Sequence, residues 1–419
     1  MSELSYLEKL LDGVEVEWLP LGEITKYEQP TKYLVKAKDY HDTYTIPVLT
    51  AGKTFILGYT NETHGIYQAS KAPVIIFDDF TTANKWVDFD FKAKSSAMKM
   101  VTSCDDNKTL LKYVYYWLNT LPSEFAEGDH KRQWISNYSQ KKIPIPCPDN
   151  PEKSLAIQSE IVRILDKFSA LTAELTAELT AELNMRKKQY NYYRDKLLNF
   201  KDIARGGNCI LPGIMDDIRV EWKTLGEIAV IYDGTHKTPK YTASGVPFVS
   251  VQNIKNLYGT NKYISPEDFK TYKNKPRKHD LFMTRIGDVG TCAIVEDDRP
   301  LAYYVTLALI RINQQIAVPG FIRYLIESRF GKAELYKRTL IHAVPMKINL
   351  GEIGKVAVPI PCPDNPEKSL AIQSEIVRIL DKFDTLTNSI TEGLPREIEL
   401  RKKQYEYYRD LLFSFPKHP

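Results

Sequence analysis

The chain has 419 residues, of which 43% are hydrophobic, so it is long enough to form two or three domains with cores of their own. Its formal net charge of +4 does not by itself indicate a nucleic-acid binder. The five cysteines are odd in number and form no Cys-x-x-Cys pair, which argues against a disulfide framework or a structural zinc site. The first residues contain no apolar signal core, and no run of about 18 apolar residues occurs. We therefore expect a reduced, cytoplasmic protein with no membrane span.

An internal repeat divides the chain into two similar halves. Residues 144–168, PIPCPDNPEKSLAIQSEIVRILDKF, recur letter for letter at 359–383, an offset of 215. Residues 185–200 match residues 400–415 at the same offset. Upstream, VEWLPLGEI at 16–24 matches VEWKTLGEI at 220–228 with an offset of 204, so the variable stretch of the second half is 11 residues longer. Each half is therefore a variable domain followed by a repeated segment.

These boundaries predict five segments, and the charges are distributed accordingly. The segments are an N-terminal piece that completes the repeat at 1–23, a first variable domain at 24–143, a central repeated region at 144–217, a second variable domain at 218–358 and a distal repeated region at 359–419. Lys and Arg outnumber Asp and Glu by 16 to 13 in 24–143 and by 19 to 11 in 228–358, whereas the rest of the chain has a net charge of −7. Because phosphate neutralisation needs Lys and Arg, we expect any DNA to bind the variable domains.

The repeated segments have the pattern of long helices. After Pro151 and again after Pro366, apolar residues recur in steps of four and three, which is typical of a coiled-coil seam. Three tandem TAEL units at 172–183 continue the first helix, whereas Gly393 and Pro395 predict a kink or break in the second. We expect the two helices to pair antiparallel because each has an apolar stripe that needs a partner. The variable domains would then lie at opposite ends of a pseudo-twofold, nearly circular arrangement.

Both variable domains have the pattern of mixed α/β structure. Strand-like runs occur at 44–49, 54–59 and 73–78 in the first domain, and at 247–251, 281–285, 292–295 and 305–312 in the second. A helix is expected after them in each domain, at 110–119 and at 321–337. Leu-Lys-Tyr in the first of these helices and Ile-Arg-Tyr in the second suggest one fold with two different surfaces.

Several loop residues have side chains suited to reading DNA bases. Arg can bind guanine, and Gln or Asn can bind adenine, through paired hydrogen bonds. For any one of these residues a solvated loop side chain is the simpler interpretation, since most DNA contacts go to phosphate. The candidates are Gln29, Thr31, Lys53, Lys85, His130, Lys131, Arg132 and Gln133 in the first domain, and Thr235, His236, Lys237, Thr238, Gln252, Asn253 and Arg285 in the second.

Motifs for catalysis are missing. An adenine methyltransferase would have an Asn/Asp-Pro-Pro-Tyr/Phe motif, and the chain has no Pro-Pro dipeptide. A phosphate-binding loop ending at Gly52-Lys53-Thr54 would need glycine at position 47, which is proline. Asp268-Phe269-Lys270 resembles half of a nuclease metal site but has no clear acidic partner on a strand. The seven histidines show no metal-ligand spacing, so we expect no bound metal and no chemistry in this chain.

The chain as a whole resembles the specificity subunits (HsdS) of type I restriction-modification systems. The signals are the Pro-Ile-Pro-x-Pro lead-in at 144–148 and 359–363 with the helix Ile-Val-x-Ile-Leu-Asp-Lys-Phe that follows, and the TAEL units, which resemble the IC class. The resemblance implies two target recognition domains, each reading one short half-site of double-stranded DNA across an unspecified spacer. It also implies a non-catalytic chain that scaffolds its partner subunits.

The resemblance also suggests which partners and cofactors take part. Two methyltransferase subunits using S-adenosylmethionine would bind the repeated helices, and two ATP- and Mg-dependent motor-nuclease subunits would complete the enzyme. The KKQYxYYRD blocks at 187–195 and 402–410 are candidates for subunit contact, although a helix end packed locally is an equal interpretation. A freestanding bipartite DNA-binding regulator and a coiled-coil scaffold remain the alternatives.

Overall fold

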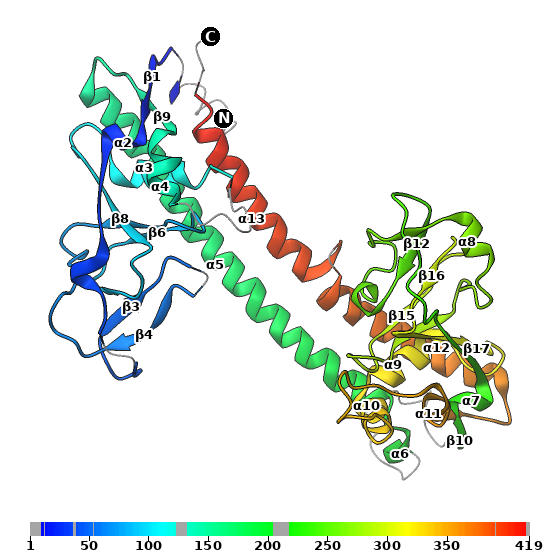
Figure 1. Ribbon diagram of the computed structural model, residues 1–419. Helices are drawn as coiled ribbons and strands as arrows, with labels where there is room; N and C mark the ends of the chain where they lie inside the picture. The colour runs from blue at the N-terminus through cyan, green and yellow to red at the C-terminus, as the bar shows by residue number, and fades with distance from the viewer. Residues whose placement is uncertain are drawn as a thin grey trace. The chain divides into compact units, whose positions relative to one another are not determined.

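The structure is a computed structural model that describes residues 10–11, 13–36, 39–52, 54–122, 132–203, 218–389 and 391–415. It divides into two compact units, residues 1–178 with 398–419 and residues 179–397. Each unit contains one mixed α/β domain and parts of the long helices (Figure 1). The expectation of two mixed α/β domains with long helices is therefore confirmed. None of the described helices is long and apolar enough to cross a membrane.

The first unit is built on a four-stranded antiparallel sheet in the order β2-β8-β5-β6. These strands are β2 (Thr25–Glu28), β8 (Met98–Ser103), β5 (Val74–Asp78) and β6 (Asn84–Val87). A three-stranded sheet follows in the order β4-β3-β7, formed by Ile56–Thr60, Ile46–Leu49 and Lys92–Ala93. The helix α3 (Leu111–Leu118) packs against the larger sheet, because its buried Tyr113 and Trp117 share a core with Ile75 and Phe77.

The second unit repeats this strand order with different residues. Its larger sheet runs β11-β17-β14-β15, formed by Ala229–Asp233, Leu307–Ile312, Leu281–Thr284 and Cys292–Ile294. Its smaller sheet runs β13-β12-β16, formed by Tyr263–Ile264, Val246–Val249 and Ala302–Tyr303. In both small sheets the middle strand pairs parallel with the last, β3 with β7 and β12 with β16. The two variable domains therefore share one strand topology.

Two short ribbons join the variable domains to the repeated helices, and we did not predict them. β1 (Val16–Pro20) pairs antiparallel with β9 (Lys142–Pro146), and β10 (Val220–Thr224) pairs antiparallel with β18 (Ala357–Pro361). The Pro-Ile-Pro lead-in of each repeat is thus a strand bound to a Val-Glu-Trp segment. Proline is disfavoured in a central strand, but a two-stranded ribbon tolerates it because each strand keeps one unpaired edge.

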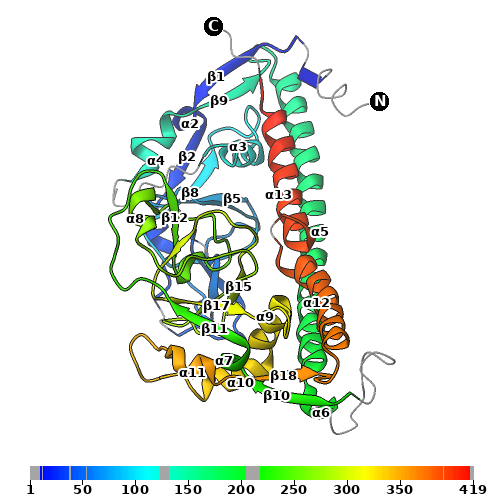
Figure 2. The same ribbon diagram turned by 90° about the vertical axis from the view of Figure 1, so that its right-hand side faces the viewer.

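The long helices agree with the predicted pattern in most respects. α5 runs from Pro151 to Leu197 without interruption through the TAEL units. The second copy is divided into α12 (Pro366–Asn388) and α13 (Gly393–Leu412), so the expected break is present. The prediction of a single helix at 321–337 was wrong. α9 (Pro319–Glu327) is followed by Ser328, whose backbone is extended and whose side chain caps α10 (Arg329–Tyr336). Figure 2 shows α9 lying against α12.

Within each unit, an aromatic pair joins the two copies of the repeated helix. Phe168 stacks on Tyr408 in the first unit, with ring centroids 5.3 Å apart, and Phe383 stacks on Tyr193 in the second at 5.5 Å. Ile157 and Ile161 of the predicted seam belong instead to the core of the first α/β domain. Antiparallel pairing along the full helices and a pseudo-twofold arrangement therefore stay predictions.

The remaining elements are short helices that connect the strands. They are α2 (Leu21–Ile24), η1 (Pro30–Tyr33), α4 (Gln133–Ser136), η2 (Tyr138–Gln140), α6 (Phe200–Ile203), α7 (Leu225–Ile228), η3 (Val251–Asn253), α8 (Pro266–Lys270) and α11 (Leu350–Gly354).

Candidate nucleic-acid interface

The predicted DNA residues lie mainly at one edge of each larger sheet. β2 and β5 both pair antiparallel with β8, so they run parallel to each other and their carboxyl ends lie at the same edge. The same holds for β11 and β14, which flank β17. Gln29 follows β2, and Arg285 follows β14. This edge is where loops of different sequence can be displayed on the shared framework.

In the second unit, the segment Tyr303 to Thr306 brings three of the predicted clusters together. The amide of Thr235 donates to the carbonyl of Tyr303 at 3.1 Å, and the amide of Val305 donates to the carbonyl of Thr235 at 3.0 Å. The amide of Arg285 donates to the carbonyl of Thr306 at 3.0 Å. The Thr306 hydroxyl accepts from the amide of Val251, which precedes Gln252. Clusters separated by up to about 50 residues in the sequence therefore lie side by side.

Arg285 is placed differently from a free base-reading side chain. The residue is only 7% exposed, and its Nη1 lies 2.7 Å from Oδ1 of Asp233. Its Nε donates to the carbonyl of Ile348 at 3.2 Å, and Nη1 also donates to the carbonyl of Val305. Asp233 in turn lies 2.8 Å from Nε2 of the exposed His236. This geometry favours a positioning role for Arg285, with His236 nearer to solvent.

The other candidates of the second domain differ in how free their side chains are. Lys237, Thr238 and Gln252 are exposed, as a base or phosphate contact requires. Asn253 accepts hydrogen bonds through Oδ1 from the amide and hydroxyl of Ser250, so it caps the short helix η3. Thr235 donates to the carbonyl of Lys237 at 3.3 Å. The exposed members are therefore the stronger candidates for direct DNA contact.

In the first unit, two charged residues that we did not predict organise the same edge. Asp79 and Lys99 are fully buried and form an ion pair with Oδ2 and Nζ 3.2 Å apart. The ammonium of Lys99 also lies 4.9 Å from the centre of the Tyr27 ring. Asp79 accepts from the amides of Gln133 and Trp134 at 2.9 and 3.1 Å. No local pattern marks this pair, because Asp79 and Lys99 come from different segments of the sheet.

The predicted residues of the first domain surround this ion pair in part. Arg132 lies 4.0 Å from Asp79 through Nη1 and Oδ2, and its side chain is half exposed. Gln29 precedes η1, where Thr31 is exposed, and Lys85 is exposed on β6. Lys53, His130 and Lys131 lie outside the described residues.

Each α/β domain is attached to its repeated helix by the same set of contacts. Gln158 accepts from the amide of Leu110 at 2.9 Å, and Gln373 accepts from the amide of Val318 at 2.9 Å. The hydroxyl of Tyr116 donates to Asp166, and that of Tyr324 donates to Asp381 at 2.6 Å. Because the helix residues are identical copies, different domains are held on equivalent attachment points.

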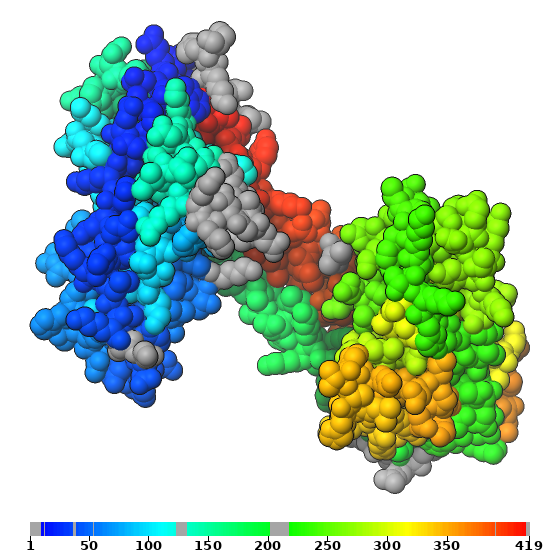
Figure 3. Space-filling model, in the orientation of Figure 1, coloured from blue at the N-terminus to red at the C-terminus, as the bar shows by residue number. Residues whose placement is uncertain are grey.

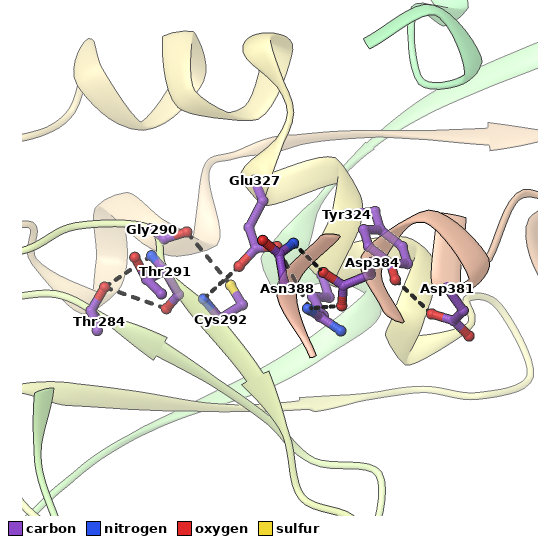
Figure 4. A network of polar contacts seen from close by, with 10 residues as sticks. Thr284, Gly290, Thr291, Cys292, Tyr324, Glu327, Asp381, Asp384 and Asn388 are labelled. Atoms are coloured by element: carbon purple, nitrogen blue, oxygen red, sulfur yellow. Dashed lines mark hydrogen bonds and ion pairs between the residues drawn. The ribbon is translucent and has the colours of Figure 1, made fainter. Parts of the chain in front are cut away.

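A polar network extends this attachment in the second unit, as Figure 4 shows. Glu327 of α9 accepts from the amide of Cys292 on β15 at 3.0 Å. Arg323, on the same helix, donates to Asp384 of α12 at 2.7 Å. Burial raises the pKa of Glu327 and, more strongly, that of the Cys292 thiol. The network joins the sheet to the repeated helix through buried groups, which favours a rigid attachment.

The residues that suggested metal chemistry do not form a metal site. Asp268 lies in the first turn of α8, where its amide is capped by Ser265. Among the residues that the structure describes, no group of three His, Cys, Asp or Glu is placed to hold a metal ion.

Comparisons with known proteins agree with this architecture. The family model described as the type I restriction modification DNA specificity domain matches residues 13–185 and 219–400. The specificity subunit of the Escherichia coli type I restriction enzyme EcoR124I/EcoR124II is 63% identical, covering 100% of this chain and 98% of that protein. The Escherichia coli EcoprrI specificity subunit is 35% identical over 94% and 93%.

A solved structure supports the fold. A chain from work on complex assembly and conformational transition of the type I R-M system superposes with a TM-score of 0.54 at 15% identity, covering 95% of this chain and 97% of that one. The matching family model covers both halves of the chain and the 63% identical relative covers all of it. The chain therefore belongs to the type I restriction-modification DNA specificity family, as a non-catalytic specificity subunit that recognises DNA sequence.

Proposed function

We propose that each α/β domain reads one half of a bipartite DNA target, through the loops at the edge where β2 and β5, or β11 and β14, end. The observation that carries this proposal is the pair of matched attachments: two domains of one topology but different loops are held on identical helix copies through Gln158 and Gln373. A shared framework with different loops suits one enzyme that reads two different short sequences.

Exposed side chains among the predicted DNA residues of the two domains offer a test. Lys237→Ala and Gln252→Ala change the second domain, and Thr31→Ala and Lys85→Ala are the matched changes in the first. Sequencing the methylated sites in cells that carry the intact system should show relaxed preference in one half-site for each pair. The other half-site should stay unchanged. Relaxed preference in both half-sites for any one variant would contradict the proposal that each domain reads only one half-site.

We further propose that the repeated helices bind one methyltransferase subunit each. Both copies present an exposed tyrosine at matching positions, Tyr192 at 57% and Tyr407 at 60% exposure. The neighbouring rings, Tyr193 and Tyr408, are held by stacking on Phe383 and Phe168. Two closely matching exposed patches suit two copies of one partner, and aromatic residues are enriched at such interfaces. S-adenosylmethionine, ATP and Mg would then serve partner subunits acting on DNA in the cytoplasm.

The stoichiometry can be measured with matched variants. Tyr192→Ala and Tyr407→Ala should each lower the occupancy of one methyltransferase site, and the double variant should lower both. The native mass of the complex after co-purification reports the number of bound subunits. Unchanged mass for the double variant would show that the subunits bind elsewhere.

A further inference from the structure

An apolar loop projects from the second α/β domain between α10 and α11. Leu340, Ile341 and Met346 are exposed, and Val344 is 100% exposed. The space-filling view shows the yellow-to-orange part of the chain, which includes this loop, at the surface of the unit (Figure 3). A cluster of exposed aliphatic side chains on a loop indicates a binding surface that a ligand or partner covers.

Hydrogen bonds fix the loop to the predicted DNA-reading edge. The amide of Leu340 donates to the carbonyl of Lys347 at 2.8 Å, which closes the loop on itself. The amide of Gly287 donates to the carbonyl of Met346 at 2.8 Å, and that of Ile348 donates to the carbonyl of Arg285 at 3.0 Å. The loop is therefore hydrogen-bonded to the turn after β14, whose Arg285 pairs with Asp233.

The charges around the loop favour a polyanion as the occupant. The segment 337–347, KRTLIHAVPMK, contains no acidic residue. Lys347 and His342 are exposed within it. Lys337 and Arg338 at its start are partly neutralised, since both form ion pairs with Glu334. Exposed aliphatic side chains beside basic residues suit duplex DNA. Aliphatic groups can pack against thymine methyl groups or between base steps, while the cations bind phosphates.

We propose that the loop from Leu340 to Lys347 is an apolar DNA-contact element for the half-site read by the second domain. The proposal rests on the proposed function, since it assumes that this domain reads a half-site of its own. Ile341 and Val344 would lie against the DNA in a groove, and Lys347 would lie toward the backbone.

The first domain has a different sequence at the corresponding positions. The amide of Gln133 donates to the carbonyl of Asp79, as that of Ile348 donates to the carbonyl of Arg285, and the two acceptors follow the matching strands β5 and β14. At this offset of 215, Val344, Pro345 and Met346 correspond to Asp129, His130 and Lys131. The two domains therefore have an apolar and a polar sequence at these positions, although residues 129–131 lie outside the described residues.

The test uses the full chain assembled with its methyltransferase subunits. The variant combines Ile341→Ser and Val344→Ser, and the control is Val230→Ser, which changes an exposed valine on the edge strand β11. Affinities are measured over a range of salt concentrations on three duplexes: the target mapped in cells, and the same duplex with either half-site scrambled. Thermal unfolding verifies that each variant is folded.

The expected result is at least roughly tenfold weaker binding of the double variant to the target, because full burial of one aliphatic side chain is worth about this much and the variant removes two. The slope of affinity against salt should not change, because no phosphate contact is removed. The loss should persist when the first half-site is scrambled and should disappear when the second is scrambled. Val230→Ser should bind like the wild type.

Other results would overturn the inference. An unchanged affinity, or a loss of equal size on all three duplexes, would exclude a contact specific to the second half-site. A lower methyltransferase content in the complex would assign the loop to a protein partner instead. If scrambling the second half-site leaves wild-type binding unchanged, the proposed function itself fails, and this outcome is independent of the loop variants.

Discussion

The guanidinium of Arg285 and the carboxylate of Asp233 form a largely buried ion pair, with Nη1 2.7 Å from Oδ1. The pair joins the end of β14 to the end of β11, the two strands that carry the predicted reading loops of the second domain. Removing one member of such a pair leaves the other charge poorly solvated. Arg285 therefore holds the loops in place more directly than it could read a base.

Arg285→Ala should accordingly lower stability and DNA discrimination together. We expect the free energy of unfolding to fall by about 2–3 kcal/mol, because Asp233 loses its partner in a poorly solvated site. Preference within the second half-site should relax at the same time. Urea unfolding and binding to variant duplexes measure the two effects. Arg378→Ala, which removes an exposed arginine paired with Glu375 on its own helix, should change neither appreciably. Relaxed preference with unchanged unfolding would instead make Arg285 a base contact.

The isolated chain should neither methylate nor cut DNA. Its sequence lacks the methyltransferase and phosphate-loop motifs. Adding methyltransferase subunits should produce adenine methylation, and cleavage should need the motor subunits as well. Incorporation of labelled methyl groups checks the first statement, and methyl transfer by the purified chain alone would disprove it.

Deleting residues 176–179, one TAEL unit, should change the length of the DNA spacer. The units lie within the uninterrupted helix α5, so the deletion shortens it by ~6 Å with a rotation of ~40°. At ~3.4 Å per base pair this corresponds to a change of one or two base pairs. Both half-sites should stay the same.

Sequencing of methylated sites in a strain with the deletion gives the spacer directly. Glu178→Gln keeps the helix length and should leave the spacer unchanged. If the parental spacer persists after the deletion, partner subunits must set the separation of the domains.

The stacked pair of Phe168 and Tyr408 should contribute measurable coupling between the two helix copies. Aromatic pairs of this geometry add about 0.5–1.5 kcal/mol beyond the area that they bury. A double-mutant cycle with Phe168→Leu and Tyr408→Leu, followed by urea unfolding, measures the coupling. The matching cycle with Phe383→Leu and Tyr193→Leu should give a similar value, whereas strictly additive effects would show that the rings do not interact.

Glu327 should give the second unit a specific pH dependence. Burial raises the pKa of this carboxyl above its ordinary 4.5, although Arg323 opposes the shift. The native state therefore keeps the proton to higher pH than the unfolded state, so the stability due to this group falls as pH rises from 4.5 through the raised pKa. Glu327→Gln keeps an acceptor for the Cys292 amide and cannot ionise.

The unfolding free energy of the Gln variant relative to wild type should consequently increase from about pH 4 to about pH 7. Urea unfolding of both proteins across this range isolates the contribution, because all other groups are shared. A difference that does not vary with pH would mean that Glu327 titrates normally.

The repeat and its periodicity determined the broad plan of this protein. Identical 25-residue segments with apolar steps of four and three predicted the helices α5 and α12, and Gly393 with Pro395 predicted the break before α13. These features depend on residues a few positions apart, so local patterns suffice. The resemblance to specificity subunits likewise rested on motifs that are continuous in the sequence.

Only the tertiary structure decided what individual side chains do. Arg285 has the residue type and loop position of a base reader, yet strands distant in the sequence bury its guanidinium against Asp233. The Asp79–Lys99 pair and the exposure of Val344 likewise depend on segments that are not neighbours in the chain. The burial and ion pairing of a side chain depend on which distant segments pack together. A pattern of neighbouring residues therefore cannot predict them.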